Sequence, residues 1–197
     1  MDKILTVVIP SYNVEKFLNQ TLDSFVCDED TMKKFEVIVV DDGSKDNTAK
    51  IGKEYADKYP DTFRVISKEN GGHGSTINCG IRNAVGKYFK VVDGDDWVNT
   101  PDFVKLVEDL EKTESEYVFT NYYEYYDDVN RQKAVDFPQF KDGTEYDFAD
   151  VANKVYIPMH ALMIKTSVLK DNNIVIDEKC FYVDVEYVMF PVPFVNK

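Results

Sequence analysis

The chain has 197 residues, with 36 acidic and 23 basic side chains, and its formal net charge is −13. This length suits one sizeable domain, and 44% hydrophobic residues with 14% aromatics predict a packed core and exclude a disordered chain. The negative charge argues against nucleic acid and anionic lipid as partners, because both attract surfaces rich in Lys and Arg. An acidic protein can still bind a phosphorylated substrate when a divalent metal supplies positive charge.

The cysteines and the chain ends bear on the compartment. Cys27, Cys79 and Cys180 are odd in number and lack metal-ligand spacing, so we expect free thiols in a reducing compartment. No signal peptide precedes the first strand-like run, and no apolar stretch reaches the roughly 18 residues that cross a bilayer. We expect a cytoplasmic location, extending to the inner face of the cell membrane. Membrane contact would come only from sequence after residue 197, where the apolar end predicts that the natural chain continues.

Strands and helices alternate through the first half of the chain. Apolar, β-branched runs predict buried strands at 4–9, 35–40, 63–67 and 88–92. Helical spacing of apolar residues predicts intervening helices at 13–25, at 47–59 and around 77–84. Pro10 is expected to end the first strand, and Asn13 to cap the first helix. The alternation implies right-handed crossovers and a mainly parallel sheet, whose polar junctions would gather at one edge and form one site.

The second half is less regular. A helix is expected after Pro101, and the aromatic run 117–126 predicts a strand. Residues 127–144 are polar and are interpreted as a hairpin or as an insertion that faces a second substrate. The pattern then predicts a helix at 146–154, an extended segment at 161–164 and a short helix at 167–172. No linker marks a domain boundary.

Three carboxylates directly follow the fourth predicted strand: Asp93, Asp95 and Asp96, with Gly94 among them. Like charges this close cost free energy unless a cation or a raised pKa relieves the repulsion. Hard oxygen ligands at Asp-x-Asp spacing suit Mg²⁺ or Mn²⁺, which bridge protein carboxylates to substrate phosphates. The alternative is an acidic loop that caps the next helix, and this stretch alone leaves both interpretations open.

Two other junctions carry polar groups. Asp41-Asp42-Gly43-Ser44 offers acceptors for a base or a ribose, although a turn with a helix cap explains it more simply. Asn70-Gly71-Gly72-His73-Gly74 could bring amides close to a diphosphate, although it is neither a Walker loop nor a dinucleotide fingerprint. His73 is equally well explained as a polar loop residue. We expect His160 to pack beside its neighbouring methionines.

Three further side chains have both a functional and a structural interpretation. Tyr12 could stack on a base, but packing as an ordinary aromatic is favoured. Arg82 could face a phosphate, and the alternative is a solvated surface charge. Asp184 lies in an apolar run, where a carboxylate is costly unless it is paired, caps a helix or is functional. A helix cap and a catalytic base are equally supported for Asp184.

Taken in order, these stretches resemble the family 2 inverting glycosyltransferases of the GT-A fold, which are nucleotide-diphospho-sugar transferases. The resemblance is strong over residues 4–110 and weaker to the Asp184 region. It is carried by Val7-Val-Ile-Pro-Ser-Tyr-Asn13, Val40-Asp-Asp-Gly-Ser-Lys-Asp46, Asn70-Gly-Gly72, Asn78-x-Gly80, Gly86-Lys-Tyr88 and Val92-Asp-Gly-Asp-Asp-Trp97. It implies one α/β domain over residues 1–197, with a Rossmann-like central mixed, mainly parallel sheet flanked by helices. The donor half would span about 1–100 and the acceptor half about 101–197.

The resemblance also implies an activity and a set of site residues. A hexosyl or N-acetylhexosaminyl group would move from a nucleotide-diphosphate sugar, usually a UDP-sugar, to a hydroxyl of a glycan or glycolipid acceptor with inversion. Such transfer would serve the synthesis of cell-surface polysaccharide or glycolipid. Asp184 would be the catalytic base and Asp95 the ligand of Mg²⁺ or Mn²⁺. The donor-binding residues implied by motif position are Pro10, Tyr12, Asp42, Asn70, Gly71 and Asp93, the last at the ribose or the metal shell.

The chain departs from the family pattern in three places. Val183 precedes Asp184 where the family commonly has Glu, so Glu186 is an alternative base. The segment Ser75-Thr-Ile-Asn78 lacks a phosphate-facing arginine found in many members. The Gln-x-x-Arg-Trp motif of processive members is absent, which favours single addition.

Two other classes of function remain open. Nucleotidyltransferases also use aspartates at strand ends and a divalent metal, but they usually have a glycine-rich basic loop near the N-terminus, unlike Pro10-Ser-Tyr-Asn13. A nucleotide-sugar-binding module without transfer activity is the non-enzymatic alternative.

Overall fold

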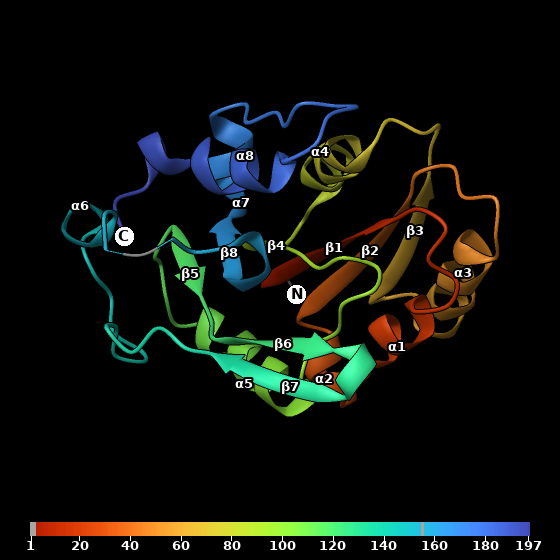
Figure 1. Ribbon diagram of the computed structural model, residues 1–197, viewed down its shortest axis with the longest axis horizontal. Helices are drawn as coiled ribbons and strands as arrows, with labels where there is room; N and C mark the ends of the chain where they lie inside the picture. The colour runs from red at the N-terminus through yellow and green to blue at the C-terminus, as the bar shows by residue number, and fades with distance from the viewer. Residues whose placement is uncertain (1–2, 155) are drawn as a thin grey trace.

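The computed structural model describes residues 3–154 and 156–197. A six-stranded sheet in the order β3-β2-β1-β4-β8-β5 forms its centre, with helices on both faces (Figure 1). Strands β1 to β4 are mutually parallel, whereas β8 runs antiparallel to β4 and β5. The strands are β1 (Leu5–Ser11), β2 (Phe35–Asp41), β3 (Phe63–Ser67), β4 (Tyr88–Val91), β5 (Tyr117–Phe119) and β8 (Leu162–Lys165). The predicted mixed, mainly parallel sheet flanked by helices is confirmed.

The helices divide between the two faces of the sheet. In Figure 1, α4 (His73–Asn83), α7 (Thr166–Asp171) and α8 (Val183–Met189) lie above the sheet. Below it lie α1 (Leu18–Asp23), α2 (Glu29–Met32) and α5 (Thr100–Leu110), with α3 (Thr48–Lys58) beside β3. The remaining short elements are α6 (Phe148–Val151) and the 3₁₀ turns η1 (Asp127–Val129), η2 (Met159–Ala161) and η3 (Val192–Phe194).

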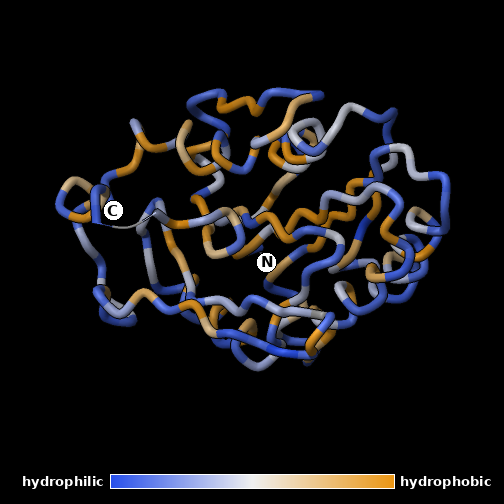
Figure 2. The backbone as a smooth tube through the Cα atoms, in the orientation of Figure 1, coloured by the Kyte–Doolittle hydropathy of each residue, from blue (hydrophilic) through white to orange (hydrophobic). Residues whose placement is uncertain are grey.

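Burial on both faces explains why the central strands read as continuous apolar runs. All seven residues of β1 are buried, and alternate side chains enter two separate cores. Val8 packs in the core under α4, α7 and α8, whereas Val7 and Ile9 pack in the core over α1 and α5. Figure 2 shows the hydrophobic colour running along β1 and β2 through the middle of the molecule.

Two local predictions near β1 are wrong. The strand continues through Pro10 to Ser11. The Val8 carbonyl faces β4, where it accepts from the Val92 amide, and Pro10 faces the same way because orientation alternates. Pairing with β4 has already ended there, so no bond needs the missing N–H of proline. Asn13 caps no helix: it has φ 55, and its side-chain oxygen accepts from the Lys45 amide at 2.8 Å.

The aromatic run in the second half forms two strands, not one. Residues 117–119 stay in the main sheet as β5, whereas β6 (Tyr122–Tyr126) leaves it and pairs with β7 (Arg131–Val135). This antiparallel pair is a hairpin, one of the two interpretations of 127–144, but only its turn and second strand lie in that range, because the first strand ends at Tyr126. The helices predicted at 13–25 and 146–154 are shorter than expected, and α2 has too few residues to show a period.

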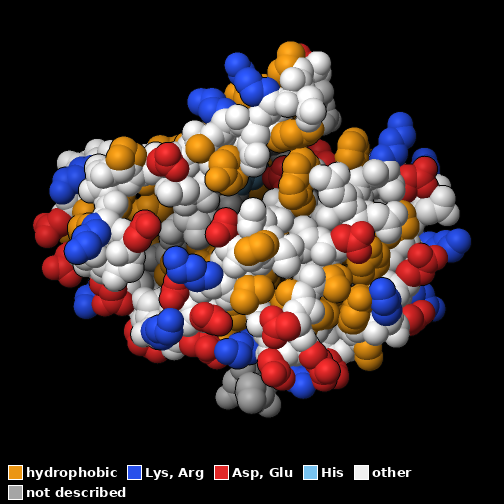
Figure 3. Space-filling model, turned by 90° about the horizontal axis from the view of Figure 1, so that it is seen from below, with side chains coloured by type: hydrophobic (Ala, Val, Ile, Leu, Met, Phe, Trp, Pro, Cys, Tyr) orange, Lys and Arg blue, Asp and Glu red, His pale blue; other side chains and the backbone are white. Residues whose placement is uncertain are grey.

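The surface mixes both signs of charge. On the lower face of the molecule, Lys and Arg lie among Asp and Glu (Figure 3), and ion pairs such as Lys34–Glu111 at 2.9 Å join neighbouring elements. Among the helices in the described part of the chain, none combines the length and the apolar character that crossing a membrane requires.

Candidate active site

The polar junctions meet at the carboxyl edge of the parallel strands, as the alternation of elements predicted. The antiparallel strand β8 adds a residue that the spacing of motifs could not indicate. Since Met163 pairs with Lys90, the chain that enters β8 passes the end of β4. His160 thereby lies beside the acidic loop, with its Nδ1 3.6 Å from Oδ2 of Asp96. The His160 side chain is half exposed, so it is not enclosed by the methionines expected beside it.

Three potential metal ligands converge at this edge. One ligand atom each from Asp93, Asp96 and His160 lie within 4.8 Å of one another. Two carboxylates and an imidazole form a donor set that suits Mn²⁺, and the carboxylates also suit Mg²⁺. Asp95 lies outside this group, although it is exposed like Asp96 and His160. The assignment of Asp95 as metal ligand stays a prediction, and the geometry adds Asp96 and His160 as candidates.

The electrostatics of this group favour a bound cation. Burial raises the pKa of Asp96, and the nearby carboxylates of Asp93 and Asp95 raise it further, against the opposing effects of His160 and Lys90. The negative charges at this edge are therefore incompletely compensated by the protein itself, which is the condition that a divalent cation relieves.

Lys90 is a site residue for which the sequence analysis predicts no role. It is buried, its Nζ donates to the His160 carbonyl at 2.7 Å, and burial lowers its pKa to about 8. Lys90 thus ties the backbone of η2 to the end of β4 and places a cation near Asp96. A single lysine inside an apolar strand is the signal that could have identified it, because such a lysine needs a buried partner.

Asp42 organises the glycine loop after β3. Its buried carboxylate accepts from the amides of Gly71 at 3.0 Å and Gly72 at 2.8 Å, and from Lys68 Nζ at 2.7 Å. Burial raises the pKa of Asp42, but Lys68 and the two amides outweigh this and lower it overall. The side-chain amide of Asn70 also donates to the backbone carbonyl of Asp42, with Nδ2 3.0 Å from the oxygen. These two glycine amides are therefore already occupied by a protein carboxylate.

A pocket of about 270 Å³ lies next to the acidic loop. It is lined by His73, Asp93, Met159, His160, Cys180, Phe181, Tyr182, Val183 and Asp184. The fold thus brings the carboxylate predicted as the base together with Asp93. A larger hollow of about 580 Å³ lies between α3 and β3, away from the carboxylates, and contains none of the predicted site residues.

His73 joins the two parts of this pocket. Its buried Nε2 lies 3.0 Å from Asp93 Oδ1 without the alignment of a hydrogen bond, and the two side chains form an ion pair when the imidazole is protonated. Burial lowers the pKa of His73, but Asp93, Asp184 and Asp42 outweigh burial, and the pKa is raised overall. His73 thus lies within the electrostatic influence of three carboxylates.

The two candidate bases have different surroundings. Asp184 lies in the first turn of α8 and lines the pocket. Glu186 accepts from the amide of Asp177 at 2.8 Å and does not line the pocket. The helix cap is Tyr182, with φ 66 and no side-chain capping bond, so Asp184 is not the cap.

The other predicted residues lie around this edge, with one exception. Pro10 lies near the end of β1 and Tyr12 follows it, and Tyr12 is 49% exposed, so the favoured interpretation as a packed aromatic is wrong. Arg82 lies in the last turn of α4 and is exposed, as expected for a solvated charge. This turn lies at the opposite end of α4 from His73.

Residues 6–172 match the family model described as Glycosyl transferase family 2. The chain belongs to this family. Among its relatives is an uncharacterized glycosyltransferase, EpsJ of Bacillus subtilis, with 37% identity over 123 residues. The match covers 62% of this chain but only 35% of EpsJ, so the chain corresponds to about a third of that relative.

Solved structures show the same fold. A TarS fragment (residues 1–349) of S. aureus in complex with UDP-GlcNAc superposes with a TM-score of 0.75 and 23% identity, covering 95% of this chain and 52% of that one. The mannosyltransferase PcManGT of Pyrobaculum calidifontis in complex with GDP-Man and Mn²⁺ gives a TM-score of 0.66 and 20% identity, covering 95% and 51%. The predicted GT-A fold is confirmed.

Proposed function

We propose that this protein transfers a sugar, with inversion, from a nucleotide-diphosphate sugar to an acceptor hydroxyl. The observation that carries the proposal is the pocket that brings together Asp93, from the middle of the chain, and Asp184, from near its end, with His73 in the same wall. A carboxylate base beside a candidate metal group is what a single displacement on a nucleotide-sugar requires. Family membership supports this chemistry over nucleotidyl transfer.

Asp93, Asp96 and His160 would hold Mn²⁺ or Mg²⁺. Asp95, next to Asp96 in the sequence, remains the ligand that the family motif implies. When bound, the cation neutralises charge on the nucleotide diphosphate and makes it a better leaving group. Lys90 keeps the His160 backbone at the end of β4. PcManGT, a neighbour of the same fold, was solved with Mn²⁺, which supports a divalent metal here.

Asp184 would accept the proton of the acceptor hydroxyl. As that O–H bond breaks, the oxygen forms the new glycosidic bond on one face of the sugar, and the bond to the diphosphate breaks on the opposite face. One displacement needs one base and no covalent sugar–enzyme intermediate. The position of Asp184 on the pocket wall supports this role over Glu186, which is engaged by the Asp177 amide.

On the donor side, Pro10, Tyr12, Asp42, Asn70 and Gly71 would surround the nucleoside. Tyr12 has an exposed ring that is free to stack on a base. Asp42 acts mainly by holding Gly71 and Gly72 in place. A UDP-sugar is the proposed donor, supported by the TarS neighbour solved with UDP-GlcNAc. The proposed setting is cytoplasmic synthesis of a cell-surface polysaccharide or glycolipid, one sugar per reaction.

Two measurements test the proposal. Calorimetry with UDP should show binding that requires Mn²⁺ or Mg²⁺, and equal binding in EDTA would exclude the metal group. A panel of nucleotide-sugars should reveal at least one that is hydrolysed in a metal-dependent way. Binding of UDP without hydrolysis of any donor would instead favour a nucleotide-sugar-binding module.

A further inference from the structure

The segment that leads to α8 is fastened to α4 by one buried asparagine. Asn78 Nδ2 donates to the Ile176 carbonyl at 2.8 Å and to Glu178 Oε1 at 3.1 Å, and Oδ1 accepts from the Ile176 amide at 2.9 Å. The Asn78 side chain is 3% exposed, so these bonds are shielded from water. An asparagine that pairs with both backbone groups of one residue fixes the position and the direction of that backbone.

The glycines before Asn78 allow the same segment to approach. A Cβ atom on Gly74 would lie 2.0 Å from the Asp177 carbonyl oxygen, a distance at which the backbone must move. Gly72 has φ +83, and a Cβ there would meet the Lys179 amide nitrogen at 3.2 Å. The Lys179 amide donates to the Gly71 carbonyl at 3.0 Å. The small glycine residues therefore leave the space in which residues 176–179 pack against the glycine loop and the start of α4.

The contact between the glycine loop and residues 176–179 is connected by hydrogen bonds to both halves of the pocket. On the donor side, the amides of Gly71 and Gly72 are held by Asp42. On the other side, the Asp177 amide donates to Glu186 of α8, two residues after Asp184 in the same helix. Any shift of residues 176–179 away from α4 is therefore transmitted to the helix that carries Asp184.

We propose that Asn78 and Gly74 are positioning residues, which hold residues 176–179 against α4 and thereby place Asp184 opposite the donor. The inference rests on the proposed role of Asp184 as the base. According to this inference, Gly74 and Asn78 determine where the acceptor half of the site lies relative to the donor half. Neither residue contacts the reacting atoms.

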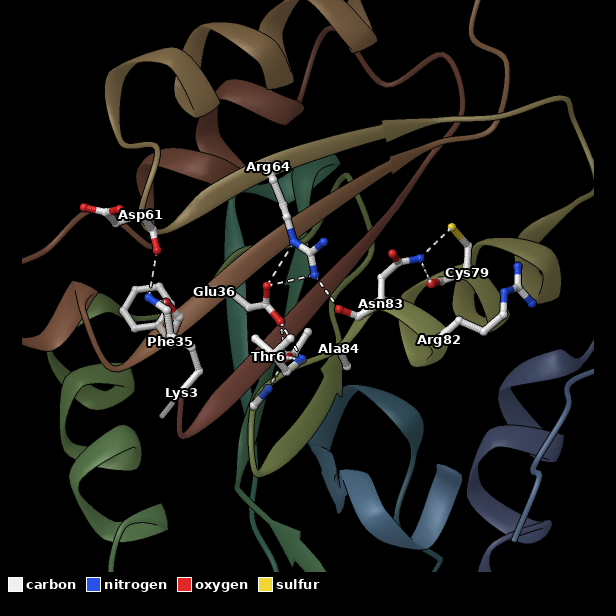
Figure 4. A network of polar contacts seen from close by, with 12 residues as sticks. Lys3, Thr6, Phe35, Glu36, Asp61, Arg64, Cys79, Arg82, Asn83 and Ala84 are labelled. Carbon is white, nitrogen blue, oxygen red and sulfur yellow. Dashed lines mark hydrogen bonds and ion pairs between the residues drawn. The ribbon is translucent and has the colours of Figure 1, made fainter. Parts of the chain in front are cut away.

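The same helix provides a matched control. Asn83 also lies on α4, but its side chain donates only to Cys79 of its own helix, as Figure 4 shows. A general effect on α4 would appear in Asn83→Ala as well as in Asn78→Ser. Gly74→Ala is a second, independent variant. Alanine favours helix over glycine by about 1 kcal/mol in a helix interior, so a role confined to α4 predicts no loss for this variant.

Hydrogen exchange tests, without any substrate, whether Asn78 and Gly74 hold residues 176–179 against α4. The amides of Ile176 and Lys179 should be protected in the wild-type protein, and their exchange should accelerate in Asn78→Ser and Gly74→Ala but not in Asn83→Ala. Amides in the second half of α4 should stay protected in all four proteins. Unprotected amides in the wild type, or unchanged protection in both variants, would overturn the inference.

Donor hydrolysis and UDP binding then test the positioning of Asp184. With the nucleotide-sugar that the wild type hydrolyses, turnover should fall by about 10- to 100-fold in both variants, since displacements near 1 Å cost this much. Calorimetric affinity for UDP with Mn²⁺ should be retained. Released amides with full turnover, or equal losses of turnover and UDP affinity, would overturn the inference. If instead Asp184→Asn hydrolyses the donor as fast as the wild type, the proposed role of Asp184 as the base is rejected. The hydrogen-exchange result still tests whether Asn78 and Gly74 hold residues 176–179 against α4.

Discussion

The two ends of the parallel strands carry acids in opposite circumstances, one buried at the amino end and two partly exposed at the carboxyl end. At the amino end, Glu36 Oε1 accepts from Thr6 Oγ1 at 2.6 Å and the Val85 amide at 2.9 Å, and Oε2 accepts from Arg64 Nε at 3.0 Å. Figure 4 shows this network across three neighbouring strands and the loop after α4, where Arg64 also reaches the Asn83 carbonyl. Each carboxylate oxygen of Glu36 has a hydrogen-bond partner. This network of Glu36, Thr6, Val85 and Arg64, called the joint below, is complete without a ligand and connects the strands.

At the carboxyl end, the acids face one another. Asp93 and Asp96 lie close together, and the pKa of Asp96 is raised, first by burial and then by the carboxylates of Asp93 and Asp95. Stability alone would replace such a pair with neutral or apolar residues. The contrast teaches that satisfied acids mark a joint in this protein, whereas mutually repelling acids mark the place reserved for a ligand.

The largest expected effect comes from removing the proposed base. Asp184→Asn keeps the shape of the side chain but cannot accept a proton, so donor hydrolysis should fall by about 100-fold or more. Rates measured with the same metal and nucleotide-sugar check this. Glu186→Gln is the matched comparison, and a larger loss there than in Asp184→Asn would move the base to Glu186.

The next effect concerns the joint. Glu36→Gln keeps the size of the side chain but removes the charge that pairs with Arg64, and we expect the free energy of unfolding to drop by about 1–3 kcal/mol. Urea unfolding measures this drop, and UDP affinity should be unchanged. The exposed acid Glu29, paired with Lys33, is the control: Glu29→Gln should change stability by less than about 0.5 kcal/mol. Equal effects of the two variants would remove the distinction between joint and surface.

A smaller effect of opposite sign is expected at the repelling acids. Asp96→Asn relieves repulsion, so the protein in EDTA should melt at a higher temperature than the wild type, by up to about 1 kcal/mol in stability. In Mn²⁺ the order should reverse, since the variant loses a ligand and the stabilisation that binding adds. A variant that is less stable in EDTA would show that these carboxylates do not repel one another.

The smallest effect is a dependence on pH. The folded-state pKa of Asp42 is lowered, so its contribution to stability is full above the unfolded value of about 3.9 and disappears as pH falls through the folded value. The difference in melting temperature between wild type and Asp42→Asn should therefore be constant at neutral pH and shrink in acid. A difference that grew with acidity would contradict the assigned partners of Asp42.

Predictable and unpredictable features of the site separate along the same lines. Parallel strands must end at one edge, so Asp42 and Asp93 could be placed together from the alternation of elements alone. His160 could not, because it reaches that edge through the antiparallel pairing of β8 with β4, which no local pattern encodes. The Asn13 prediction failed because its side chain bonds to Lys45 from another loop instead of the nearest helix.

By itself, the sequence determined the buried strands, the mainly parallel sheet and the edge where polar junctions gather, because periodicity and turn chemistry are local properties. Only the tertiary structure decided which acids have partners. It gave Glu36 an arginine, Asp42 two glycine amides and Asp184 an open pocket. These outcomes depend on contacts between residues far apart in the chain, and their energies arise from burial that exists only after the layers have packed.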